Sequence, residues 1–376
     1  MKILHFISGG DTGGAKTHVL TLLPRLMDIG VEIELLCIME GVFTREARKL
    51  NIPVNIILQK RRYDITVLKK IRKFINENNF DIVHCHGARA NYIAAFIRKK
   101  INAVMITTLH SDYKLDFKDT WHKQIIYAPI NYFALKRFRY ILTVTNAFKE
   151  MMIKRGFKND RLFVVYNGID FSYKPCFISK EDFFKKYRVR YDENKKYVGI
   201  AARLNVVKGI DIFLKTAFYI CENKKDVDFI IAGDGDDFEK YKSEIELKGL
   251  SDRIFMIGHI DDMDSFFNAV DVNTLTSLSE SFPYSLLEGA RMKKATVSTS
   301  VGGIPEMIVD GETGFLVSPG NINDISEKIM RLVSDDSLAE SFGQAFYRRA
   351  EKNFSDVEMA RTHKNIYEKI VKENKQ

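Results

Sequence analysis

Residues 277–319 read SLSESFPYSLLEGARMKKATVSTSVGGIPEMIVDGETGFLVSP, and they hold a denser pattern of strand, helix and turn signals than the rest of the chain. The apolar run 270–276 before them predicts a strand, and Pro283 suits the first residue of a helix over 284–292. A second strand is predicted at 295–299. Strand, helix and strand in this order are typical of a parallel sheet covered by helices.

Two glutamates frame the start of this predicted helix, with seven residues between them: Glu280 precedes the helix and Glu288 lies inside it. One interpretation is that they are caps or solvated charges. The other is a ligand site, because the first amides of a helix lack helical partners and its macrodipole favours negative charge. Glu280 would then accept hydrogen bonds from sugar hydroxyls and Glu288 from a ribose diol. The backbone of this predicted ligand site belongs to Phe282, Pro283, Tyr284 and Ser285.

Two further motifs follow, GGIPE at 302–306 and DGETGFLV at 310–317. Together with the paired glutamates they resemble the signature of the large retaining, nucleotide-sugar-dependent glycosyltransferases of family four. Ser281 departs from that pattern, since many members have glycine there. The resemblance covers essentially the whole chain. It implies the GT-B fold: an α/β protein with two doubly wound, parallel-sheet (Rossmann-like) lobes, a cleft between them, and a C-terminal helix that crosses back to the first lobe.

The rest of the chain also alternates predicted strands and helices, as two doubly wound sheets require. The polar, charged segment 172–196 is interpreted as the crossing between lobes. We therefore expect an acceptor-side lobe at 1–188 and a nucleotide-sugar-binding lobe at 189–355. The apolar spacing within 356–376 predicts the final helix, which would belong to the first lobe. With 376 residues and 45% hydrophobic content, the chain is large enough for two cores.

Open parallel sheets bind ligands at the carboxyl ends of their strands. The first such loop is rich in glycine, a weak signal alone, and by resemblance it closes over the donor diphosphate. Lys16 departs from the family here, because many members carry glutamate. In the second lobe, Arg203 and Lys208 would aim two cations at one spot, which suits a leaving diphosphate. The remaining donor-binding positions are Gly10, Gly13 and Gly14 in the first loop, and Gly233, Gly258, His259 and Ile260, where the family holds the base through backbone contacts.

Histidines follow two strands of the first half. His84 and His86 occupy alternate positions, so a metal pair is geometrically allowed, but no third ligand stands at motif spacing. We predict no metal and no cofactor besides the donor. A lone histidine is most often structural, but by resemblance His110 lies beside the reacting sugar. The predicted catalytic residues are thus His110, Arg203, Lys208 and Glu280, acting through a front-face mechanism in which the leaving phosphate takes the acceptor's proton.

Charge is distributed unevenly along the chain. Residues 1–188 carry 33 Lys and Arg against 17 Asp and Glu, a net charge of +16, whereas the remainder has −7. A basic half can face nucleic acid, an anionic membrane surface or an anionic acceptor, or it can be solvated surface only. No transmembrane segment is visible in the sequence. Four scattered cysteines, with no metal-like spacing, are typical of buried thiols in a reduced cytoplasm.

The sequence thus predicts a glycosyltransferase that moves a sugar from a nucleotide diphosphate to a sugar, glycan or lipid-linked acceptor, in cell-surface polysaccharide or glycolipid synthesis. Its expected location is the cytoplasm, either free or peripheral on the inner face of the membrane. One alternative is a sugar-nucleotide epimerase of the same fold, which would need acid and base carboxylates but no acceptor. The other is a nucleic-acid-binding protein, although no motif of that class is present. The donor base, donor sugar, acceptor and oligomeric state stay open.

Overall fold

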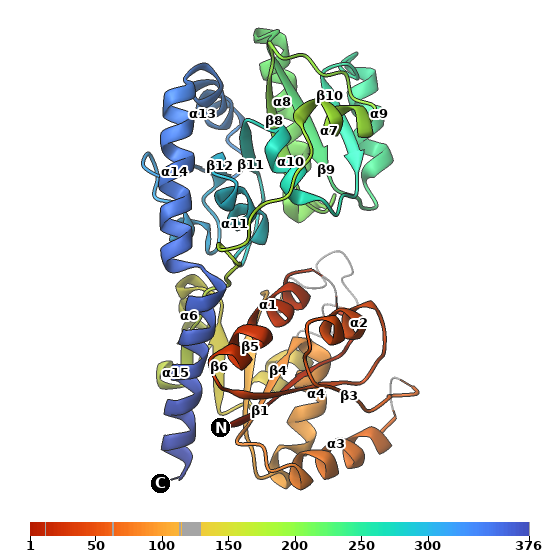
Figure 1. The fold of residues 1–376 in the computed structure, drawn as a ribbon, viewed down its shortest axis with the longest axis vertical. Helices are drawn as coiled ribbons and strands as arrows, with labels where there is room; N and C mark the ends of the chain where they lie inside the picture. The colour runs from red at the N-terminus through yellow and green to blue at the C-terminus, as the bar shows by residue number, and fades with distance from the viewer. Residues whose placement is uncertain (12, 62–63, 113, 115–128, 376) are drawn as a thin grey trace. The chain divides into compact units, whose positions relative to one another are not determined.

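The structure, a computed structural model, describes residues 1–11, 13–61, 64–112, 114 and 129–375 (Figure 1). The chain forms two compact units. The first comprises Met1–Asp170 with Ser355–Gln376, and the second comprises Phe171–Phe354. Each unit has its own parallel sheet and its own core.

The first unit is built on a seven-stranded sheet in the order β3-β2-β1-β4-β5-β6-β7, and every neighbouring pair is parallel. The order reverses between β1 and β4, which makes the sheet doubly wound as predicted. Its strands are β1 (Lys2–Ile7), β2 (Glu32–Cys37), β3 (Val54–Ile56), β4 (Ile82–His86), β5 (Val104–Leu109), β6 (Tyr140–Thr143) and β7 (Leu162–Val164).

Helices alternate with these strands. In chain order they are α1 (Gly14–Asp28), α2 (Val42–Lys49), α3 (Thr66–Glu77), α4 (Gly87–Ile97), η1 (Arg98–Lys100), α6 (Asn146–Lys154), η2 (Asn159–Arg161) and α15 (Asp356–Lys375). The C-terminal helix α15, blue in Figure 1, packs on α1 and belongs to the first compact unit. Its apolar stripe is buried, Tyr367 and Ile370 completely.

The second unit has a six-stranded parallel sheet in the order β10-β9-β8-β11-β12-β13. Its strands are β8 (Lys196–Ala201), β9 (Val227–Ala232), β10 (Ile254–Gly258), β11 (Val272–Leu275), β12 (Ala295–Thr299) and β13 (Phe315–Val317). Its helices are α7 (Lys180–Lys186), η3 (Val206–Lys208), α8 (Ile210–Asn223), α9 (Phe238–Leu247), α10 (Met263–Ala269), α11 (Tyr284–Arg291), α12 (Ile304–Met307), α13 (Ile322–Ser334) and α14 (Asp336–Asn353).

The two units divide at Asp170, earlier than the boundary predicted at 188. The segment interpreted as a polar crossing contains the helix α7, which Ser179 caps by accepting from the Asp182 amide. Its Phe183 and Phe184 are almost completely buried, in a cluster of aromatic rings in the second unit. Two adjacent aromatic residues do not show the 3.6-residue spacing of a helix. The charged residues around them therefore led to the prediction of a polar crossing.

Three other expectations met different outcomes. The alternation of elements predicts a helix at 119–138; residues 119–128 lie outside the described part of the chain, and residues 129–135 are helical. Cys37, Cys85 and Cys221 are buried, but Cys176 is exposed, so the prediction of four buried thiols was wrong for that residue. No described helix combines the length and the apolar character that crossing a bilayer requires.

Candidate active site

The loop that carries Glu280 is fixed by an ion pair at the carboxyl edge of the second sheet. Lys208 Nζ lies 2.5 Å from Glu280 Oε1, and the Ser277 hydroxyl donates to the same oxygen over 2.6 Å. Because β8 and β11 are parallel neighbours, the segments that follow them meet at one edge. The Leu278 amide donating to the Val207 carbonyl (2.8 Å) ties these segments together. The structure thus joins two predicted catalytic residues directly.

Arg203 follows β8 at the same edge of the sheet, with a different environment. Its side chain is exposed and has no hydrogen-bond or ion-pair partner among the described residues. The Asn205 amide donates to its carbonyl over 3.0 Å, which holds the backbone in a tight turn. A guanidinium held on an ordered turn and left unpaired is suited to bind an anion.

Gly302 supports the Glu280 loop from behind. Its φ is +55°, and a Cβ there would overlap the carbonyl oxygen of Glu280. The next residue, Gly303, donates its amide to the Ser281 carbonyl over 3.0 Å. The GGIPE motif therefore needs glycine at 302 because two backbone segments approach closely there.

Gly302→Ala is expected to lower the free energy of unfolding by about 3 kcal/mol or more, because strain and a backbone overlap act together. Gly320→Ala is the matched control: its φ is +80° but the space around its Cβ is open. That variant should lose only about 1 kcal/mol, the cost of the left-handed conformation. Urea unfolding of both variants measures the difference, and equal losses would show that the overlap is absent.

The helix α11 places a second polar pair on one of its faces. Tyr284 and Glu288 are one turn apart, and the Tyr284 hydroxyl is buried without a partner in the described part of the chain. Glu288 likewise has no hydrogen-bond partner among the described residues, and burial raises the pKa of its carboxyl. Since buried polar groups are nearly always satisfied, the Tyr284 hydroxyl, with the half-buried Glu288 beside it, marks a place for a hydrogen-bonding ligand.

The start of α11 differs slightly from the prediction. Pro283 precedes the first helical residue and takes an extended conformation, φ −72° and ψ 126°. Phe282 is buried and packs edge-on against Phe354, with ring centroids 5.1 Å apart. Ser285, in the first turn, is half-buried. Phe282 thus anchors the helix start, and only the first-turn backbone and polar side chains are available to a ligand.

The predicted base-binding loops lie together at the ends of β9 and β10. The Gly233 amide donates to the Gly258 carbonyl over 2.8 Å. A Cβ on Gly258 would meet open space, which leaves its backbone accessible. Ile260 is buried in the core, and His259 is exposed, with its ring Nε2 3.2 Å from the Asp261 carboxylate. Contacts from this region to a base would therefore come from the backbone and from His259.

The glycine-rich loop of the first unit enters α1 through Gly13, whose φ of +68° suits glycine. The Asp11 carboxylate accepts from the Ser8 hydroxyl (2.5 Å) and the Gly9 amide (3.1 Å), which stabilises the turn. No side chain would crowd a Cβ at Gly14, while Gly10 lies against Met39. Lys16, the departure from the family pattern, forms an ion pair with Glu46 (2.6 Å).

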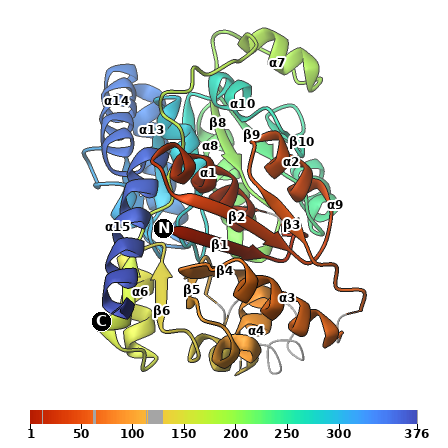
Figure 2. The same cartoon turned by 60° about the horizontal axis from the view of Figure 1, so that its bottom comes forward.

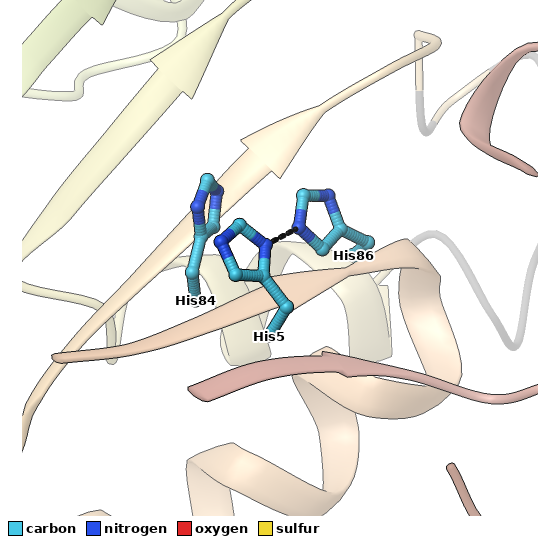
Figure 3. A group of neighbouring side chains, drawn as sticks. All are labelled: His5, His84 and His86. Carbon is cyan, nitrogen blue, oxygen red and sulfur yellow. Dashed lines mark hydrogen bonds between the residues drawn. The ribbon is translucent and has the colours of Figure 1, made fainter. Parts of the chain in front are cut away.

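His110 belongs to a cluster that holds six of the seven histidines in the described part of the chain. Its Nε2 lies 3.1 Å from His86 Nδ1, and the other nitrogen of His86 lies 2.9 Å from His5 Nδ1, the bond drawn in Figure 3. Sequence spacing identified His84, His86 and His110 only. The other members, which the sequence analysis missed, are His5, His18 and His363.

Burial keeps these histidines neutral. It lowers the pKa of His18 to about 4 and that of His363 to about 3. Burial also lowers the pKa of His5, His84, His86 and His110 well below the ordinary value, with repulsion from neighbouring histidines adding to it. Neutral imidazoles carry one donor and one acceptor each, so the cluster can form a directed hydrogen-bond network.

Two sets of three histidines place ligand-capable nitrogens within 4.8 Å of one another: His5, His84 and His86, and His18, His86 and His110. In the first set the nitrogens are already hydrogen-bonded, and His84 uses both of its own, to Tyr367 (2.6 Å) and Thr108 (2.7 Å). A metal would have to displace these bonds. The sequence spacing showed no third ligand beside His84 and His86, whereas the structure places His5 there. Hydrogen bonds alone account for the positions of these three side chains.

Comparison with known families identifies both halves of the chain. Residues 12–173 match the family described as Glycosyltransferase Family 4, and residues 180–349 match Glycosyl transferases group 1. The two matches meet close to the observed boundary between the compact units.

Individual relatives agree with this assignment. The chain is 27% identical to an uncharacterized glycosyltransferase of Methanocaldococcus jannaschii, over 95% of both chains. It is 23% identical to the GPI3 subunit of the phosphatidylinositol N-acetylglucosaminyltransferase of Saccharomyces cerevisiae, over 95% of this chain and 80% of that one. The structure of Anabaena HepE in complex with UDP superposes with a TM-score of 0.84 at 20% identity, covering 98% of this chain and all of that one. The chain therefore belongs to the family-four glycosyltransferases of the GT-B fold.

Proposed function

We propose that this glycosyltransferase takes its sugar from a nucleoside diphosphate and transfers it with retention of anomeric configuration. The proposal rests on one observation at the carboxyl edge of the second sheet. There Arg203, which is exposed and has no partner among the described residues, follows β8, and the Lys208–Glu280 ion pair joins the loops after β8 and β11. A leaving diphosphate needs a fixed positive charge, and a sugar needs a fixed carboxylate acceptor. Both are present on rigid elements, as preorganised catalysis requires.

In this mechanism Arg203 binds the diphosphate and stabilises the charge that develops as the sugar leaves. Lys208 orients Glu280, whose second oxygen accepts from the sugar, and it adds a positive charge beside the phosphate. His110 would donate a hydrogen bond to a sugar hydroxyl. The acceptor hydroxyl attacks from the side of the leaving phosphate, and its proton passes to a phosphate oxygen. No protein nucleophile and no metal take part in this scheme.

We further propose uridine diphosphate as the nucleotide, because Anabaena HepE, a structural neighbour of this chain, has been crystallised with UDP and with UDP-glucose. The unsatisfied Tyr284 and Glu288 would bind the ribose hydroxyls. The backbone of the Gly233 and Gly258 loops would contact the base. Amides and carbonyls can recognise a uracil edge without any specific side chain.

Glu288→Ala is expected to weaken UDP binding roughly 10-fold or more, the scale of a lost hydrogen bond to a charged group. Tyr284→Phe should have a smaller effect in the same direction. Glu246→Ala, which removes an exposed glutamate at the end of α9, is the control and should bind UDP normally. Titration calorimetry gives the dissociation constants, and unchanged affinity in both α11 variants would rule out the ribose assignment.

We propose a lipid-linked acceptor, reached from the cytoplasm at an anionic membrane surface. The yeast relative is named for phosphatidylinositol, and an Escherichia coli relative for a diphosphoundecaprenol acceptor. In the first unit α3 and α4 lie side by side (Figure 2), and the Asn76 amide group donates to the Lys100 carbonyl (3.0 Å) where α3 meets η1. We call the exposed groups on these elements the basic face: Lys69, Lys70, Lys73, Arg98, Lys99 and Lys100, with Tyr92 and Phe96.

The apolar stripe of α3 is not part of this face. Val67, Ile71 and Ile75 are buried in the core, so the helix offers the membrane its charges rather than its apolar residues. The two exposed aromatics are on α4 instead, with ring centroids 4.8 Å apart. Aromatic rings beside cations are typical of surfaces that rest on the membrane interface.

Replacing Lys69, Lys70 and Lys73 with glutamine should weaken binding to anionic vesicles roughly 100-fold, since each basic residue contributes about 1 kcal/mol. Replacing three exposed lysines of the second unit, Lys215, Lys240 and Lys248, should have little effect. Co-sedimentation with phosphatidylserine-containing and neutral vesicles, at low and high salt, measures both. Equal binding to the two lipids, or none at low salt, would favour a soluble acceptor.

A further inference from the structure

Six buried or half-buried side chains of the first unit form one continuous hydrogen-bonded chain that ends at His110. Successive groups are linked over 2.7, 2.6, 3.4, 2.9 and 3.1 Å. In order, the groups are the Thr108 hydroxyl, His84, the Tyr367 hydroxyl, His5, His86 and His110.

The sheet and α15 bring these groups together. His5 on β1 is the registered partner of His84 on β4, and His86 follows two positions later, on the same face of that strand. His86 is in turn the registered partner of Thr108 on β5. Tyr367 reaches the same face from α15, and the three histidines of Figure 3 are completely buried. The chain thus depends on four elements that are distant in sequence.

A chain of neutral groups such as this one has a single direction. Each histidine has one protonated and one unprotonated ring nitrogen, and each hydroxyl has one hydrogen. Every hydrogen bond in the chain uses one donor and one acceptor. If the donor of the first bond is known, the donor of every other bond follows. The tautomer of His110 is therefore coupled to the hydroxyl of Thr108.

Thr108 sets this direction. Its hydroxyl is buried, and His84 Nε2 is its hydrogen-bond partner among the described residues. If His84 donated to Thr108, the hydroxyl hydrogen would be left without an acceptor, which is unfavourable for a buried donor. When Thr108 donates instead, His84 carries its proton on Nδ1 and donates to Tyr367, and the same order continues to His110.

We propose that Tyr367, His84, His5 and His86 are positioning residues that hold His110 neutral with its proton on Nδ1. That nitrogen has no partner among the described residues, and His110 is half-exposed, so its N–H is available to a ligand. This inference rests on the proposed function in placing the donor sugar there. His110 then donates a hydrogen bond to a sugar oxygen and does not act as a base at Nδ1.

Nitrogen-15 NMR of histidine-labelled protein tests the tautomer directly, with or without substrate. Long-range proton–nitrogen correlations distinguish protonated from unprotonated ring nitrogens. In the wild type, His110 Nδ1 should give a protonated signal. In Tyr367→Phe the remaining hydrogen bonds from His5 to His110 can point in either direction, and each direction leaves one buried nitrogen of His5 unpaired. The two tautomers of His110 therefore become comparable in free energy, and its Nδ1 signal should move toward the unprotonated range.

Tyr140→Phe is the matched control. It also removes a hydroxyl that bonds to α15, at Glu373 (2.7 Å), but that hydroxyl lies outside the chain. The His110 signals should stay as in the wild type. A protonated Nε2 on His110 in the wild type, an unchanged spectrum in Tyr367→Phe, or a stoichiometric metal ion bound by the ring nitrogens would overturn the proposal.

Activity separates this inference from the proposed function. Tyr367→Phe should lower kcat roughly 10-fold, the scale of one misplaced hydrogen bond, and leave UDP affinity unchanged. If the tautomer moves as expected but no nucleotide sugar is used by the wild type, the network is correct and the proposed function is wrong. If the wild type is active and the tautomer does not move, the positioning role is wrong.

Discussion

Lowering the pH from 7 to 5.5 is expected to remove roughly 6 kcal/mol from the free energy of unfolding of the first unit. That is a large part of the 5–15 kcal/mol that typically stabilises a domain. The effect comes from five histidines with no exposed surface: His5, His18, His84, His86 and His363.

The sign follows from where the protons bind. In the unfolded chain these histidines titrate near pH 6.5, whereas burial lowers the folded pKa of His18 to about 4 and that of His363 to about 3. Below pH 6.5 the unfolded state therefore binds more protons, and acid favours it. The loss grows as the pH falls and stops only below the folded pKa values. None of the five forms an ion pair with a carboxylate in the described part of the chain that could offset the cost.

Scanning calorimetry between pH 7.5 and 5.5 measures this loss. Hydrogen exchange of the strands β4 and β11 assigns each transition to its unit, and the second unit should change little, because the five buried histidines all belong to the first unit. His363→Leu should reduce the loss between pH 7 and 5.5 by about 1.2 kcal/mol, one fifth of the total. A first-unit transition that is constant down to pH 5.5 would show that these histidines are charged or accessible when folded.

Arg203→Ala is expected to lower kcat/KM roughly 100-fold or more without a change in stability, the scale of losing one preorganised charge contact. The stability should stay the same because this side chain is exposed and has no partner among the described residues. Arg348→Ala, another exposed arginine of the second unit, is the control. Near-normal activity in Arg203→Ala would contradict the diphosphate assignment.

Lys208→Ala should be as inactive as Arg203→Ala, for two reasons that can be separated. It removes a cation, and it leaves the buried Glu280 without its ion-pair partner, which destabilises the fold. Thermal unfolding should therefore distinguish the two variants. The double variant Lys208→Ala with Glu280→Gln should recover stability but not activity.

The fold was predictable from the sequence because it depends on local patterns. Alternating strands and helices predict parallel sheets, and both sheets were confirmed. The edge at which strands end predicts where ligands bind, so Arg203, Lys208 and Glu280 were each predicted on a loop that follows a strand of the second sheet. The ion pair between Lys208 and Glu280 was not predictable, because spacing along the chain says nothing about which side chains meet.

The histidine cluster shows where this approach fails. His5 and His363 are at opposite ends of the chain, and neither belongs to a motif. Both rings lie beside His84 because β1 pairs with β4 and α15 packs against the same unit, and neither contact can be inferred from spacing along the chain. The signal that could have been used is compositional: buried strands of this kind rarely carry histidine, yet β1 and β4 carry three.

The most direct test of the proposed function is a panel of nucleoside diphosphate sugars, read by thermal unfolding and by NMR of the released sugar. One donor, with UDP as the expected nucleotide, should stabilise the protein by about 2.7 kcal/mol at 100 times its dissociation constant. The sugar that is transferred or slowly hydrolysed should keep the anomeric configuration of the donor, and Arg203→Ala should release far less. A product of inverted configuration, or a panel in which no nucleotide sugar stabilises the protein, would contradict the account.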